Sequence, residues 1–118
     1  EDIGYSMTRI FFHNEAAQGT WSKLSLVEQM GNIGSEVARA AQWQERNEKF
    51  FWGAVSRALE LFDLTLGDPR WKTGRQEIAV AKEVFCDAAL GGKEYNSSLA
   101  DLERYFLPFA FAARKGLL

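Results

Sequence analysis

The chain has 118 residues, 47% hydrophobic and 14% aromatic, which is enough apolar material for one packed domain and excludes the disordered class. Fourteen basic and 16 acidic side chains give a net charge of −2, so no overall positive field attracts nucleic acid or an anionic membrane. No apolar run approaches the roughly 20 residues that a bilayer-spanning helix needs. The single cysteine, Cys86, has no partner for an internal disulfide. We therefore expect a single cytoplasmic domain over residues 1–118, without membrane association.

Residues 1–24 predict an N-terminal arm. Its one apolar cluster is Ile10-Phe11-Phe12, and no hydrophobic period continues on either side of it. The arm is expected to be a short strand or irregular chain that covers one edge of the core. Residues 1–6 precede Met7, and two origins stay open for them: natural sequence, or residues added for expression.

A first helix is expected to begin near Leu26. Ser25-Leu26-Val27-Glu28 has the Ser-x-x-Glu pattern of a capping box, in which each side chain satisfies a backbone amide of the other residue. The helix contains Gly31 and Gly34, although a glycine inside a helix costs up to about 1 kcal/mol relative to alanine. Tight packing against another helix is the expected reason, and a ligand approaching the backbone is the alternative.

The segment Glu48–Leu66 is apolar on nearly all sides. Because a surface helix needs an apolar face of only about 100°, this pattern predicts the central helix of a bundle. Asn47 is expected to cap its start, and Gly67 to end it in a left-handed conformation before Pro69 stops the helix. The polar residues 42–47 before it predict a tight turn, with one bent helix as the alternative.

A third helix is predicted over Arg75–Leu90, ending at Gly91-Gly92. Thr73-Gly74-Arg75-Gln76 before it repeats the capping-box pattern with Gln in the position of Glu. Ser98 is expected to open a fourth helix, in which Pro108 predicts a kink or a break near Phe106.

These elements together predict an all-α fold. We expect an up-and-down bundle of four principal helices with an N-terminal arm.

Four carboxylates are the main candidates for chemistry. Glu60 and Asp63 lie three residues apart on the second helix, and Glu83 and Asp87 lie four apart on the third. If these helices are antiparallel neighbours, the four carboxylates converge into a site for Mg²⁺, which prefers oxygen ligands. The alternative is ordinary solvated charge with ion pairs to residues such as Lys82, which the abundance of acidic residues favours.

One pair of these carboxylates also belongs to a longer motif. Glu45-x-x-Glu48 followed by Glu60-x-x-Asp63 resembles the E-x-x-E…E-x-x-D pattern of all-α nucleoside triphosphate pyrophosphohydrolases of the MazG type. The resemblance implies an enzyme whose carboxylates hold Mg²⁺ against a triphosphate.

A basic and aromatic cluster offers a third interpretation. Arg70, Lys72 and Arg75 surround Trp71, and such clusters bind single-stranded nucleic acid. A capped loop with solvated charges is the simpler explanation, so nucleic acid is not the favoured partner.

Aromatic residues near the helix ends favour binding to other protein molecules. Trp43, Phe109 and Phe111 lie near connections or ends, and the chain has more aromatic surface than one small bundle is expected to hide. We therefore expect a helical-bundle protein without catalysis or cofactor that forms homo-oligomers and binds a protein partner. Mg²⁺-dependent nucleotide hydrolysis and accessory nucleic-acid binding are the alternatives.

Overall fold

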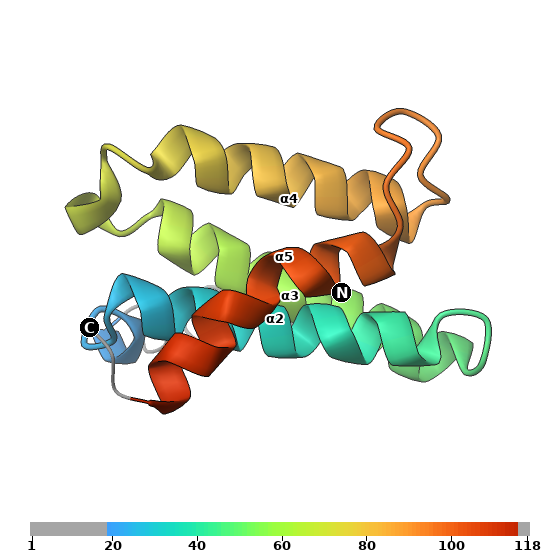
Figure 1. The fold of residues 1–118 in the computed structure, drawn as a ribbon, viewed down its shortest axis with the longest axis horizontal. Helices are drawn as coiled ribbons and strands as arrows, with labels where there is room; N and C mark the ends of the chain where they lie inside the picture. Colours follow the sequence, from blue (N-terminus) through green and yellow to red (C-terminus); the bar gives the residue numbers. More distant parts are fainter. Residues whose placement is uncertain (1–18, 116–118) are drawn as a thin grey trace, which may run out of the picture.

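The computed structural model describes residues 19–115, in which four principal helices pack against one another. They are α2 (Leu26–Trp43), α3 (Glu48–Leu66), α4 (Arg75–Ala89) and α5 (Leu99–Arg114), with a short 3-10 helix, η1 (Pro69–Trp71), between α3 and α4. Successive helices run in opposite directions along the long axis (Figure 1). The predicted all-α up-and-down bundle is confirmed.

The predicted arm falls largely outside the described range. Residues 1–18, with the Ile10-Phe11-Phe12 cluster, are not among the described residues. Residues 19–21 are helical, and Trp21 at the end of this turn is buried against the bundle. For these three residues, the expectation of a strand or irregular chain is wrong.

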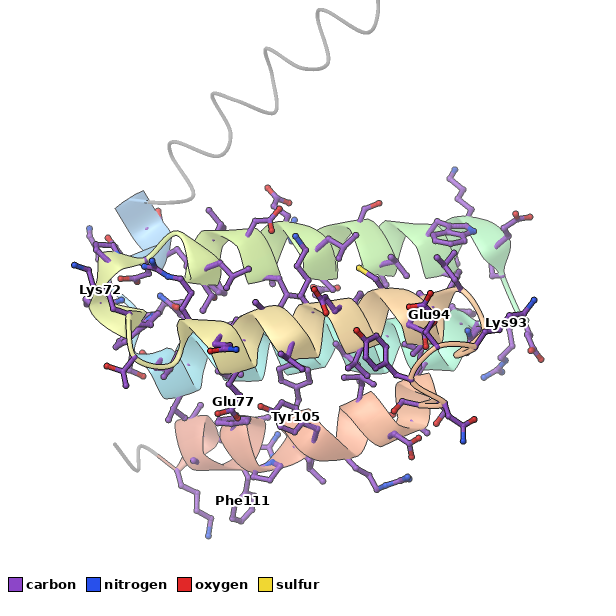
Figure 2. All side chains as sticks on the ribbon, turned by 90° about the horizontal axis from the view of Figure 1, so that it is seen from above. Lys72, Glu77, Lys93, Glu94, Tyr105 and Phe111 are labelled. Carbon is purple, nitrogen blue, oxygen red and sulfur yellow. The ribbon has the colours of Figure 1, made fainter. Side chains whose placement is uncertain are left out.

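The four helices form a closed ring rather than surrounding one central helix. α2 packs against α3 and α5, and α4 packs against the same two helices from the other side. Figure 2 shows α3 and α5 at opposite sides of the bundle. The prediction that Glu48–Leu66 is enclosed is wrong, because Phe50 and Trp52 on its flanks remain 51% and 41% exposed.

Aromatic rings from three helices meet in the core. Phe62 of α3 lies 5.8 Å from Phe85 of α4 and 5.9 Å from Phe106 of α5, measured between ring centroids. Ile33 and Val37 of α2 are also fully buried. The aliphatic side chains of α2 therefore complete a core whose centre is aromatic.

Side-chain capping sets three of the four helix starts, as predicted. The Ser25 hydroxyl accepts the N–H of Glu28 at 3.1 Å, and the Glu28 carboxylate accepts the N–H of Ser25 at 2.8 Å. Ser98 and Asp101 form the same reciprocal pair at the start of α5. Asn47 accepts the backbone N–H three residues along at 2.9 Å and caps α3.

Left-handed backbone marks two connections. The tight turn between α2 and α3 is confirmed, and Glu45 within it has φ of 68°. Gly91 and Gly92 follow α4 with φ of 117° and 73°, conformations that favour glycine. Gly67 does not have the predicted left-handed conformation: its φ is −83°, and its N–H bonds the carbonyl of Asp63 within the helix.

The predicted capping box before α4 is also wrong. Gly74 is the cap residue and no side chain caps the helix, because Thr73 lies one residue too early in the chain.

Helix α5 continues through Pro108 to Arg114 without a break. Proline leaves the carbonyl of Arg104, four residues earlier, without its helical hydrogen bond. Both residues are on the exposed side of α5, where water can satisfy that carbonyl. The predicted break near Phe106 is therefore absent, and the kink stays a prediction.

Close packing explains the two glycines of α2. A Cβ atom added at Gly34 would lie 2.7 Å from the Cβ of Phe106, and one at Gly31 would lie 3.2 Å from the Cα of Ala110. The backbone of α2 therefore lies directly against α5, and the expectation of tight helix packing is confirmed.

The replacement Gly34→Ala should destabilise the fold by about 1–3 kcal/mol, because the Cβ of Phe106 lies next to the backbone and has little room to move. Gly53→Ala in α3 is the matched control, since a Cβ there would meet nothing within 4 Å. That change should stabilise the protein by up to about 1 kcal/mol. Urea unfolding followed by circular dichroism measures both, and equal midpoints for Gly34→Ala and the wild type would contradict the packing.

Candidate functional site

The first predicted carboxylate pair lies on α3. Asp63 is exposed, and its Oδ1 lies 2.6 Å from Nζ of Lys82, so this ion pair connects α3 with α4. Glu60, one turn earlier, is half-buried. The ordinary ion pair expected as the alternative is therefore present for Asp63.

The second pair holds the loop between α4 and α5. Glu83 accepts a hydrogen bond from the hydroxyl of Tyr95 at 3.0 Å, which raises the pKa of that hydroxyl. Asp87 accepts the backbone N–H groups of Glu94 and Tyr95 at distances between 2.9 and 3.2 Å. Within residues 19–115, no group of three or more His, Cys, Asp or Glu side chains is arranged to hold a metal ion. The structure thus gives these two carboxylates a role in ordering the loop.

The basic loop predicted for nucleic acid is partly absorbed into the fold. Nη2 of Arg70 donates to the carboxylate of Asp68 and to the carbonyl of Leu24, both at 2.7 Å. The Arg70 guanidinium also lies 4.3 Å from the ring centroid of Trp71. Lys72 stays exposed at the end of the bundle (Figure 2).

A buried polar network lies behind this loop. The side-chain amide of Gln29, which is fully buried, donates to the carbonyl of Trp21 at 2.9 Å and to Asp68 at 3.0 Å, and its oxygen accepts the indole N–H of Trp71 at 2.8 Å. The indole of Trp21 donates to the hydroxyl of Thr65 at 2.9 Å. Because both ends of the Gln29 amide have partners, the network stabilises one end of the bundle.

Sequence reasoning missed this network, although one signal was present. Gln29 lies three residues after Leu26 and four before Ile33, within the apolar stripe of the first helix. A polar side chain at such an inward position needs buried partners.

Acid should weaken this end of the bundle. Hydrogen bonds from Arg70, with a smaller one from Gln29, hold the pKa of Asp68 well below its usual range. A folded-state pKa lowered in this way contributes stability above the unfolded value of 3.8, and that stability is lost as the pH falls below it. Asp68→Asn should lose about 1.5–3 kcal/mol at neutral pH, because charge-assisted bonds to buried Asp68 are weakened.

Urea unfolding at pH 7, 5 and 3 tests this prediction, with stability falling less between pH 5 and pH 3 in Asp68→Asn than in the wild type. Parallel losses in the two proteins would show that Asp68 does not carry the acid sensitivity.

A shallow groove of about 630 Å³ runs between α2 and α3 on the outer surface. The lining of this α2–α3 groove includes Glu36, Arg39 and Trp43 from α2 and Lys49, Phe50, Gly53 and Arg57 from α3. The rings of Trp43 and Phe50 meet edge to face, with centroids 5.0 Å apart. Three cations thus surround an aromatic pair in an otherwise acidic protein.

The outer face of α5 is a second exposed surface. Its stripe of exposed residues consists of Ala100, Arg104, Leu107, Pro108, Phe111 and Lys115. Leu107 is 58% exposed and Phe111 is 50% exposed, and Figure 2 shows Phe111 projecting away from the bundle. The amino group of Lys115 lies 4.7 Å from the ring centroid of Phe111.

Another side of α5 is fixed to α4. The hydroxyl of Tyr105 donates to Glu77 at 2.8 Å, and Figure 2 shows these two side chains pointing toward one another. Burial, with a smaller effect of this bond to Glu77, raises the pKa of Tyr105 to about 12. This hydrogen bond adds an attachment to α4 to the packing of α5 on α2.

The chain matches no family model, no curated protein and no solved structure. Among the described helices, none is long and apolar enough to cross a membrane.

Proposed function

We propose that this chain is a non-catalytic binding protein of the cytoplasm, which forms homodimers through the outer face of α5 and binds a protein partner through a second surface. The observation that carries the proposal is the exposed stripe on α5. Its centre is apolar, and opposite charges lie toward the two ends of the helix.

The apolar centre of the stripe supports self-association. Leu107, Pro108 and Phe111 are all exposed and lie within two turns of each other on one side of α5. Contiguous exposed apolar residues on soluble proteins usually mark contacts. In a two-fold homodimer the same surface covers itself, so a single stripe is sufficient for both copies.

The charges favour an antiparallel arrangement of the two α5 helices. Asp101 and Glu103 lie in the first half of α5, where Arg104 pairs with Asp101 and leaves Glu103 as the acidic side chain without an ion pair among the described residues, whereas Arg114 and Lys115 lie at its end. Antiparallel pairing about Leu107 places the acidic half of each copy against the basic half of the other. A parallel arrangement would bring like charges together, which opposes association.

The dimer should be weak and reversible. One helix from each copy provides less surface than the roughly 800 Å² per partner of a standard stable interface. We therefore expect a dissociation constant on the order of micromolar.

Catalysis receives less support than binding. The Mg²⁺-dependent alternative requires converging carboxylates, whereas Asp63 pairs with Lys82 and Glu83 and Asp87 hold the loop before α5. The nucleic-acid alternative depends on the Arg70 loop, and Arg70 is already bound to Asp68.

Sedimentation velocity across micromolar concentrations should show a monomer–dimer equilibrium. Leu107→Glu should shift it to the 13.3 kDa monomer, because a carboxylate replaces the centre of the apolar stripe. The fold should be unchanged, since Leu107 is largely exposed.

Val80→Glu provides the matched control, because Val80 is 48% exposed but lies on α4. It should leave the dimer intact. A wild-type protein that is monomeric throughout, or equal loss of the dimer in both variants, would contradict the proposed function.

A further inference from the structure

We infer that the α2–α3 groove binds an amphipathic acidic helix of a partner protein. This inference rests on the proposed function, because it names the class of partner that the second surface accepts.

Gly53 gives the first indication. Three glycines lie inside the four principal helices, and two of them, Gly31 and Gly34, are covered closely by α5. Gly53 is exposed, and a Cβ atom there would meet nothing within 4 Å. Glycine weakens a helix, and no contact among the described residues explains it at this position. A helix of another protein could lie on Gly53 as closely as α5 lies on Gly34 only if this position has no side chain.

Phe50 and Trp43 provide an apolar contact for such a helix. Phe50 projects from the first turn of α3 and is more than half exposed, and Trp43 supports its ring from α2. An apolar side chain of the incoming helix would cover Phe50, as buried aromatic anchors do in helix-in-groove complexes.

The charges of the groove favour an acidic partner. Lys49 and Arg57 lie one turn before and one turn after Gly53, and the side chain of neither makes a hydrogen bond or ion pair with another described residue. Lys49 and Arg57 are eight positions apart in α3, which corresponds to about 12 Å along the helix axis. An incoming helix with two acidic residues about two turns apart would therefore pair with both.

A protein helix fits the groove better than a nucleic acid does. Glu36 also lines the groove, paired with Arg39 at 2.7 Å, and the whole chain has a net charge of −2. A continuous phosphate backbone would meet these negative charges, whereas individual carboxylates on a helix can be placed against Lys49 and Arg57 alone.

The probe is a synthetic fluorescent helical peptide of about 18 residues, with a leucine stripe on one side and glutamates on both flanks. Fluorescence anisotropy should give a dissociation constant below about 100 µM that increases with salt. A peptide with lysine in place of every glutamate, and an oligonucleotide of about 15 thymidines, should bind at least about tenfold more weakly.

Two variants test the location of the site. Gly53→Met places a long side chain in the groove, at a position where an added Cβ would meet nothing within 4 Å, and should weaken peptide binding at least about tenfold while leaving the fold intact. The double change Lys49→Glu, Arg57→Glu should have a similar effect. Its matched control is Lys72→Glu, Lys93→Glu, which changes the net charge equally at two exposed lysines outside the groove (Figure 2).

Three results would overturn the inference: no binding of the acidic peptide at millimolar concentration, tighter binding of the oligonucleotide, or equal loss of binding in the control double variant.

Sedimentation of the groove variants distinguishes a failure of the groove proposal from a failure of the dimer proposal. These variants should still dimerise, whereas a monomeric wild type that binds the peptide in the groove would contradict the α5 dimer alone.

Discussion

The contact between helix α5 and the bare backbone at Gly31 and Gly34 is the constraint on which the rest of the structure depends. Because no Cβ separates the two helices at Gly34, the side chain of Phe106 lies directly on α2 and extends into the aromatic core. With Phe106 fixed inward, Leu107 and Phe111, which lie about 100° and about 140° around the helix from it, face solvent. The surface proposed for dimer formation is therefore a consequence of two missing side chains.

Two groups of basic side chains lie beside aromatic rings, and they differ in whether the fold already binds them. Arg70 is held by Asp68, which is itself held by the buried amide of Gln29, so this cation stabilises the end of the bundle. Lys49 and Arg57 have no such partners among residues 19–115 and lie beside exposed aromatic rings. Hydrogen bonding inside the fold thus decides which of two similar basic and aromatic clusters remains free to bind another molecule.

Local chemistry was predictable from the sequence, and long-range contacts were not. Ser25, Asn47 and Ser98 cap helices as expected, because a cap involves residues within one turn. The partners of Gln29 include Asp68 and Trp71, at separations of 39 and 42 residues, which no local pattern encodes.

The candidate surfaces depend on the same long-range information. The sequence indicated exposed aromatic residues, but not that Gly34 is covered by α5 while Gly53 is bare. That difference depends on which helix lies over each glycine. Likewise, the carboxylates lie on the predicted helices, but their ion pair and loop contacts depend on how those helices pack.

Disulfide trapping tests the central claim, an antiparallel two-fold contact through α5, most directly. In a Cys86→Ala background, Leu107→Cys places one thiol at the centre of the proposed interface, where the two copies approach closely enough for a disulfide. Mild oxidation at micromolar concentration should give a covalent dimer, whereas Val80→Cys on α4 should remain largely monomeric. Equal yields at the two positions, or no dimer with Leu107→Cys, would contradict the account.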